Sequence, residues 1–153
     1  MRRRSNHLDC WQPPADRNPN DLSTVALELH AWLRTLAENG WKIFIPEIAD
    51  YEVRRELIRA KKIKSVAELN ELKMSYSYVP ITTEHMLLAA NLWAQARNAG
   101  QPTSDPKALD GDVILSAQAL TIASHFDTVI VATTNVAHIS RYCQADHWRN
   151  IAP

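Results

Sequence analysis

The segment from Pro102 to Ala119, PTSDPKALDGDVILSAQA, places several carboxylates directly before a long apolar run. The carboxylates belong to Asp105, Asp110 and Asp112, and the apolar run starts at Val113. Aspartate is favoured at a helix start because its side chain accepts hydrogen bonds from free backbone N–H groups and complements the helix dipole. The pattern predicts a helix over residues 110–126. Acidic side chains gathered at its N-terminal end suggest a divalent-metal site.

Composition and charge limit the classes of protein to which the chain can belong. A length of 153 residues with 46% hydrophobic content predicts one domain, residues 1–153, with its own core. Basic and acidic residues balance at 17 each, so no overall charge attracts nucleic acid or a membrane surface. Two cysteines are too few for a disulfide scaffold, and no apolar run reaches the roughly 18 residues that span a bilayer. The N-terminal segment lacks the apolar core of a secretory signal, so we expect a cytoplasmic protein.

The hydrophobic periodicity predicts helices that alternate with short extended segments. We expect helices over 21–38, 47–60, 65–74, 83–97, 110–126 and 136–142, and extended segments over 41–45, 76–81 and 128–132. Ser65 with Glu68 matches a capping box, and Met86 and Leu87 fall on the expected apolar face of the fourth helix. Parallel strands need crossover connections, which helices supply. The expected class is α/β, a three-layer sandwich with a short, mainly parallel central sheet flanked by helices.

Polar residues follow the predicted strands, where parallel sheets bind ligands. They are Asp9 after the first candidate extended segment, Glu52 one turn into the second helix, Asp110 and Asp112 at the late helix, and Asn135 after the last strand. Hard cations such as Mg²⁺ or Mn²⁺ take oxygen ligands, and a cation would relieve the repulsion between these carboxylates and a substrate phosphate. Three glycines in the whole chain leave no glycine-rich phosphate loop, which disfavours nucleotide-cofactor folds.

Three segments, IPEIADYEVRRELIR, LDGDVILSAQA and VIVATTNV, resemble in order and spacing the PIN domain of VapC-like ribonucleases. The resemblance covers nearly the whole chain. It implies an endoribonuclease that cleaves RNA phosphodiester bonds with a water activated by Mg²⁺ or Mn²⁺. It also implies that Asp9, Glu52 and Asp112 are metal ligands, with Asp110 close by and Asn135 in a fourth, more variable position. As the toxin of a toxin–antitoxin pair, the protein would bind an antitoxin-like inhibitory protein and form a homodimer.

The N-terminal segment departs from the family pattern. Residues 1–7 are polar where the pattern has an apolar strand, so we expect them to be irregular or a degenerate first strand. Trp11 follows Asp9 closely and would crowd the site, and Asn135 lacks the charge of an aspartate. The alternative hypothesis is therefore a catalytically impaired PIN-like module that binds nucleic acid or protein without cleaving RNA.

A basic segment, RRELIRAKKIK, comes directly after Glu52. Its cations are Arg54, Arg55, Arg59, Lys61, Lys62 and Lys64. They predict contacts to an RNA backbone or to an acidic segment of a partner protein, although a solvated helix face is the simpler alternative. His85 and His125 are expected on helix surfaces, and the spacing of His138, Cys143 and His147 matches no standard zinc site.

Overall fold

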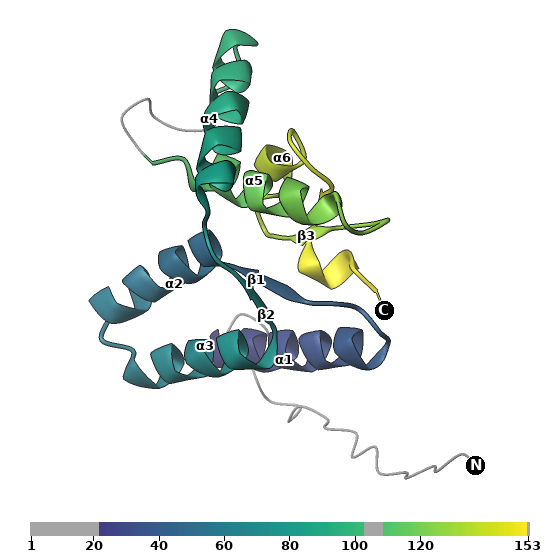
Figure 1. Cartoon of the computed structure of the whole chain (residues 1–153). Helices are drawn as coiled ribbons and strands as arrows, with labels where there is room; N and C mark the ends of the chain where they lie inside the picture. Colours follow the sequence, from purple (N-terminus) through teal and green to yellow (C-terminus); the bar gives the residue numbers. More distant parts are fainter. Residues whose placement is uncertain (1–21, 103–108, 153) are drawn as a thin grey trace, which may run out of the picture.

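The computed structural model describes residues 22–102 and 109–152 (Figure 1). Its helices are α1 (Leu22–Glu38), α2 (Glu47–Arg59), α3 (Ile63–Ser75), α4 (Thr83–Asn98), α5 (Gly111–Ala123), α6 (Val136–Ile139) and the 3-10 helix η1 (Trp148–Asn150). Its strands are β1 (Phe44–Pro46), β2 (Ser77–Val79), β3 (Val131–Ala132) and β4 (Ala145–Asp146). The first candidate extended segment, with Asp9, lies outside the described residues.

The described strands form two parallel pairs. Phe44 of β1 lies opposite Ser77 of β2, and Val131 of β3 lies opposite Ala145 of β4. The chain passes through α2 and α3 between the first two strands, and through α6 between the last two. The predicted α/β class, with short parallel strands and flanking helices, is confirmed. Within the described residues, however, the strands make two two-stranded sheets and no continuous one.

Helix α5 is the centre of the packing. It contacts α4, α2 and α6 (Figure 1), and Val113, Ile114 and Ala117 of α5 join Ile48 and Ala89 in the main apolar cluster. α5 is mostly apolar because it is covered by helices on several sides. Among the described helices, none combines the length and apolarity needed to cross a membrane.

The polar side chain of Gln118 is fully buried within α5. Its Oε1 accepts a hydrogen bond from the backbone N–H of Ile48 at 3.4 Å, and its Nε2 donates to the carbonyl of Val79 at 2.8 Å. Buried amides persist in a core when their hydrogen bonds are made. Gln118 therefore links α5 to the start of α2 and the end of β2, which fixes the position of α2 beside α5.

The third helix starts earlier than the capping box predicted. α3 begins at Ile63, and its N-cap residue is Lys62, whose side chain makes no capping hydrogen bond. Lys61 turns the chain with a positive φ of 55°, so the helix restarts directly after α2 ends. Ser65 therefore lies inside the first turn of α3, and the predicted Ser65–Glu68 capping box was wrong.

The buried face of α4 also differs from the prediction. Met86 and Leu87 are exposed, whereas His85 and Ala89 are buried. Thr82 and His85 form a capping box in which the Thr82 N–H donates to His85 Nδ1 at 3.1 Å and the His85 N–H donates to Thr82 Oγ1 at 3.3 Å. This exchange turns His85 inward, so the expectation that His85 lies on the surface was also wrong.

The C-terminal elements are shorter than predicted. The extended segment expected over 128–132 is reduced to β3, and α5 ends at Ala123 instead of residue 126. β3 pairs with the two-residue strand β4, so the ladder covers only two residues. The hydrophobic pattern of the sequence did not predict β4. Beyond β4, Trp32 Nε1 donates to the carbonyl of Ile151 at 2.9 Å, which ties the end of the chain to α1.

Candidate functional site

The N-terminal end of α5 carries the first predicted site residue. Asp110 is the N-cap of this helix, and its Oδ1 accepts a hydrogen bond from the backbone N–H of Val113 at 3.3 Å. The residue is buried, with 7% of its surface exposed. Because Asp110 stands at the cap, outside helical geometry, its direction is not tied to that of Asp112 in the first turn. Asp110 thus has a structural role whatever its part in chemistry.

Glu52 of α2 lies against the same turn of α5. A Cβ atom built on Gly111 would collide with Oε1 of Glu52 and would lie 3.0 Å from its carboxyl carbon. The carboxylate therefore fits beside α5 only because residue 111 has no side chain. Ile48, one turn before Glu52, is buried against the α5 core and holds α2 in this position.

Asp112 extends toward α6 and the loop that precedes it. Asn135 Nδ2 donates to Asp112 Oδ2 at 2.9 Å, and His138 Nδ1 lies 3.3 Å from the same oxygen. Ser116 Oγ also donates to the backbone carbonyl of Asp112 at 2.7 Å. Two side chains that are distant from Asp112 in sequence thus converge on one of its carboxylate oxygens.

His138 was not among the predicted site residues. It stands three positions after Asn135, and residues at this spacing share one side of a helical turn. The spacing N-x-x-H at the start of a short helix was therefore a usable signal, but only once Asn135 had been placed on Asp112. The sequence alone offered His138 as one of three unrelated zinc-type residues.

The described residues bring Glu52, Asp110, Asp112 and Asn135 to the first turn of α5. Asp9, the remaining predicted ligand, lies outside the described residues. Within residues 22–102 and 109–152, no three His, Cys, Asp or Glu side chains are grouped so that they could hold one metal ion. The oxygen donors of Glu52 and Asp112 suit a hard cation in kind, but these residues alone do not complete a coordination shell.

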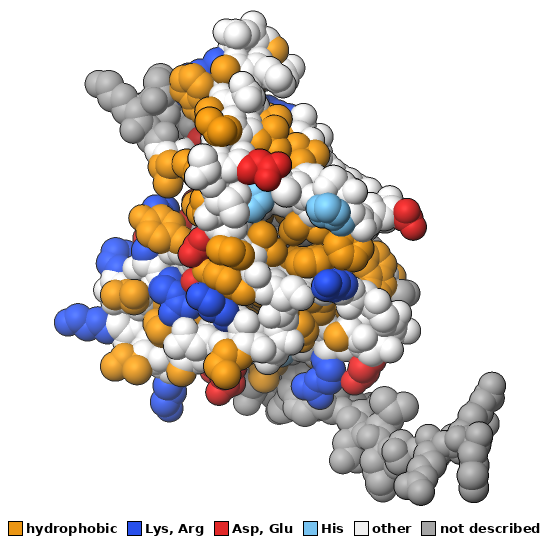
Figure 2. Space-filling model, viewed as in Figure 1, with side chains coloured by type: hydrophobic (Ala, Val, Ile, Leu, Met, Phe, Trp, Pro, Cys, Tyr) orange, Lys and Arg blue, Asp and Glu red, His pale blue; other side chains and the backbone are white. Residues whose placement is uncertain are grey.

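The predicted RNA-binding cations lie on α2 and on the turn into α3, and Figure 2 shows Lys and Arg side chains gathered over these helices. Arg54 donates from Nε and Nη2 to Asp50 at 3.1 and 2.8 Å, and from Nη1 to Asn70 of α3 at 2.9 Å. The hydrogen bond to Asp50 raises the pKa of Arg54. Arg54 thus links α2 to α3, and this structural role accounts for Arg54 without any contact to RNA.

The other basic residues are exposed. Arg55 lies over the ring of Tyr51 at 5.4 Å, and Arg59 Nε pairs with Glu56 at 2.8 Å. Exposed ion pairs of this kind contribute little to stability. Lys61 and Lys62 form the turn between the two helices. A role of these four side chains in RNA binding stays a prediction.

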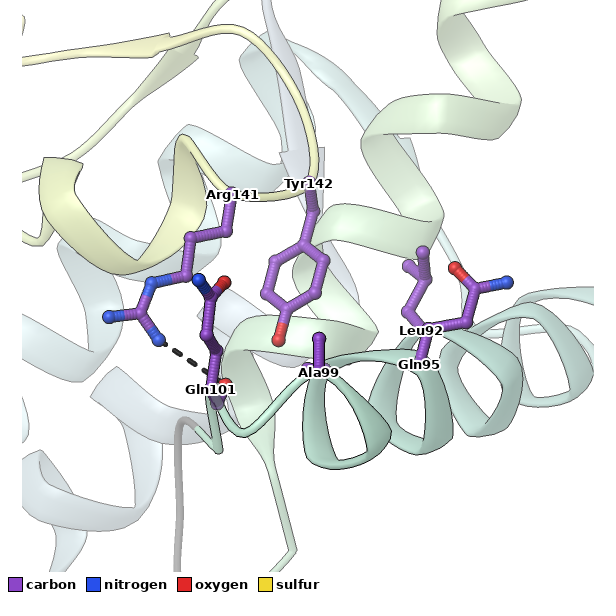
Figure 3. A pocket seen from close by; sticks show the side chains of 7 residues that line it. Leu92, Gln95, Ala99, Gln101, Arg141 and Tyr142 are labelled. Atoms are coloured by element: carbon purple, nitrogen blue, oxygen red, sulfur yellow. Dashed lines mark hydrogen bonds between the residues drawn. The ribbon is translucent and has the colours of Figure 1, made fainter.

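Two surface hollows are lined by described residues that do not include Asp112. One of about 320 Å³ lies between the C-terminal end of α4 and the residues after α6 (Figure 3), where Arg141 Nη1 donates to the carbonyl of Gln101 at 3.3 Å. The other, of about 430 Å³, is lined mainly by apolar and aromatic side chains, including Tyr51, Tyr78 and Ile114. Of the predicted site residues that the structure describes, Glu52, Asp110, Asp112 and Asn135, none lines either hollow.

No protein-family model matches the sequence. No curated protein matches it either. Among solved structures, the chain is similar to one in the structure of VapBC-1 from nontypeable Haemophilus influenzae, with a TM-score of 0.59 and 14% sequence identity. The alignment covers 82% of this chain and 93% of that chain. At this identity the similarity shows the fold alone: an α/β fold of the PIN-like kind.

Proposed function

We propose that this protein is a Mg²⁺- or Mn²⁺-dependent endoribonuclease. The observation that carries the proposal is the position of the Glu52 carboxylate against Gly111, the residue directly before Asp112 in the first turn of α5. Glu52 and Asp112 come from different helices, and Gly111 removes the side chain that would keep Glu52 away. The similarity of the fold to that of a chain in the VapBC-1 structure also supports the proposal.

In this proposal each residue has a distinct role. Glu52 and Asp112 hold the ion together with Asp9, and Asn135 orients Asp112 through its 2.9 Å hydrogen bond. Asp110 holds the first turn of α5 in place as its cap. A bound Mg²⁺ or Mn²⁺ supplies Lewis-acid chemistry for hydrolysis of a phosphodiester. Carboxylate ligands suit this task because they are negatively charged oxygen donors.

RNA is the proposed substrate. Exposed Arg55, Arg59, Lys61 and Lys62 lie on α2 and the turn after it, the same helix that carries Glu52. Cations at such positions attract the phosphate backbone and make binding sensitive to salt. Arg54 contributes to this surface mainly by holding α3 in place through Asp50 and Asn70.

We further propose that the protein is the toxin of a toxin–antitoxin pair. The similarity to a chain of VapBC-1 supports an antitoxin-like partner. Such a partner would inhibit cleavage by covering the end of α5. A homodimer is also expected for a protein of this kind, and size-exclusion chromatography with light scattering measures it.

Cleavage of single-stranded RNA tests the proposal. The purified protein should cleave the RNA with Mg²⁺ or Mn²⁺ and stop when EDTA is added. Asp112→Asn should abolish cleavage, because the amide cannot supply a charged ligand. Asp127→Asn is the matched control, since Asp127 is an exposed aspartate after α5. Equal activity of the wild-type and Asp112→Asn proteins would contradict the nuclease.

The second candidate function is an RNA- or protein-binding module that does not cleave. It is favoured by the neutral side chain of Asn135, which contacts Asp112 but adds no negative charge to the site. A gel-shift assay in Mn²⁺ distinguishes the two functions. Retained RNA that stays intact supports the module, whereas Mn²⁺-dependent fragments support the nuclease.

A further inference from the structure

We propose that His138 is a positioning residue for Asp112, which it holds jointly with Asn135. The inference rests on the proposed metal site and adds to it a residue that orients the ligand. Its basis is the pair of contacts to Asp112 Oδ2, at 2.9 Å from Asn135 Nδ2 and at 3.3 Å from His138 Nδ1.

Both contacts are made to Oδ2 of Asp112, and neither involves Oδ1. Within residues 22–102 and 109–152, no donor makes a hydrogen bond to Asp112 Oδ1. A carboxylate that accepts two contacts on one oxygen rotates less about its last side-chain bond, so the second oxygen has a preferred direction. Such outer hydrogen bonds orient ligating carboxylates and tune metal affinity.

The local structure of α6 presents Asn135 and His138 to Asp112. Asn135 is the N-cap of α6, yet its side chain makes no capping hydrogen bond and donates to Asp112 instead. Asparagine at an N-cap ordinarily accepts a bond from the first turn of its own helix. Ile139, fully buried directly after His138, anchors the helix against the core. The turn therefore presents two donors on one side while its apolar residue fixes its position.

Histidine can serve in either protonation state. The contact requires hydrogen on Nδ1, which both the neutral Nδ1–H tautomer and the imidazolium carry. The side chains are 41% exposed for His138 and 27% exposed for Asp112. A pair so open to water adds little to folding stability. Its removal should therefore affect the ligand and leave the fold intact.

Mn²⁺ binding to the full chain tests the inference without any activity assay. Isothermal titration would compare the wild-type protein with the Asp112→Asn, His138→Ala, His138→Asn and His138→Gln variants. An asparagine amide lies near the place of Nδ1, whereas a glutamine amide reaches toward Nε2. We expect His138→Ala and His138→Gln to weaken Mn²⁺ binding about tenfold or more. The Mn²⁺ affinity of His138→Asn should stay close to that of the wild type. Thermal melting should be unchanged in all three His138 variants.

His125→Ala is the control, because His125 is an exposed histidine just after α5. Wild-type Mn²⁺ affinity in His138→Ala would overturn the inference. Equal losses in His138→Asn and His138→Ala would also overturn it, since they would make the imidazole itself the ligand. If Asp112→Asn loses Mn²⁺ while His138→Ala does not, only the role of His138 fails. If wild type and Asp112→Asn bind alike, the metal site fails, and the positioning role fails with it.

Discussion

The carboxylate of Glu52 occupies the space in which a side chain at position 111 would begin. Oε1 of Glu52 would collide with a Cβ atom there, and Oε2 would lie 3.3 Å from it. Gly111 is the first residue of α5, between the capping Asp110 and the candidate ligand Asp112. The glycine thus permits the close approach of an acidic side chain, and this contact joins α2 to the candidate site.

Gly111→Ala should lower Mn²⁺ affinity while leaving the fold intact. The added methyl group displaces the end of the Glu52 side chain, which is exposed and can swing away. Alanine is also the better helix former by up to about 1 kcal/mol, so stability should not fall. Titration with Mn²⁺ and chemical denaturation measure the two effects.

The matched control for this substitution is a Glu52→Ala background. There the methyl group meets no carboxylate, so adding Gly111→Ala should cause no further loss of Mn²⁺ affinity. Additive losses in the double variant would show that Gly111→Ala acts through the backbone of α5 and not through Glu52.

Gln118→Leu should destabilise the protein by about 2–3 kcal/mol. The substitution keeps similar volume but leaves the Ile48 N–H and the Val79 carbonyl without the partner that Gln118 now provides. A buried polar group that loses its bond costs about 1–3 kcal/mol. Urea denaturation measures the change, and Gln144→Leu serves as control because Gln144 is exposed. A stability equal to wild type would mean that water replaces the amide.

Local signals in the sequence predicted the cap and the main helices, because a cap and an apolar stripe involve residues a few positions apart. Asp110 is the N-cap that LDGDV predicted, and α1 and α2 begin within one residue of their expected starts. Contacts between distant residues were not predictable in the same way. Gln118 meets Ile48 and Val79, and His138 meets Asp112, only after the helices have packed.

The buried face of α4 was predicted wrongly for the same reason, because it depends on contacts with distant residues. Several faces of α4 carry apolar residues, so periodicity alone did not choose between Met86 and Ala89. The Thr82–His85 capping box and the packing on α5 settled the choice. Likewise, β4 is too short to show an alternating pattern, and it forms because β3 offers it a partner.

Arg54→Ala should destabilise the protein by about 3 kcal/mol, whereas Arg55→Ala should have little effect. Arg54 neutralises Asp50, which is only 6% exposed, so its removal leaves a buried charge unpaired. Arg55 is exposed and lies over Tyr51. Denaturant melts of both variants measure the difference. If Arg54→Ala is as stable as wild type, Asp50 has found another partner or water, and the α2–α3 bridge is dispensable.

The free energy of unfolding should fall as pH rises into the alkaline range, because the thiol of Cys143 can then ionise in the unfolded chain. Burial raises the pKa of Cys143, against a smaller opposing effect of the nearby Ser116 hydroxyl. The unfolded thiol therefore ionises first as pH rises. The contribution to stability is complete below the unfolded pKa and is lost as pH rises through the folded pKa. Burial also raises the pKa of Tyr78, which adds a loss of the same sign at higher pH.

A Cys10→Ser background isolates the Cys143 thiol, and urea unfolding across the alkaline range measures the slope. Adding Cys143→Ser should flatten the part of the slope that begins near the unfolded thiol pKa and leave the later tyrosine part. Alkylation by iodoacetamide should also need a higher pH for folded than for unfolded protein, since the thiolate is the nucleophile. Alkylation of the folded and unfolded chains with the same pH profile would show that the thiol is not shielded by the Ile139 turn that it contacts at 4.0 Å.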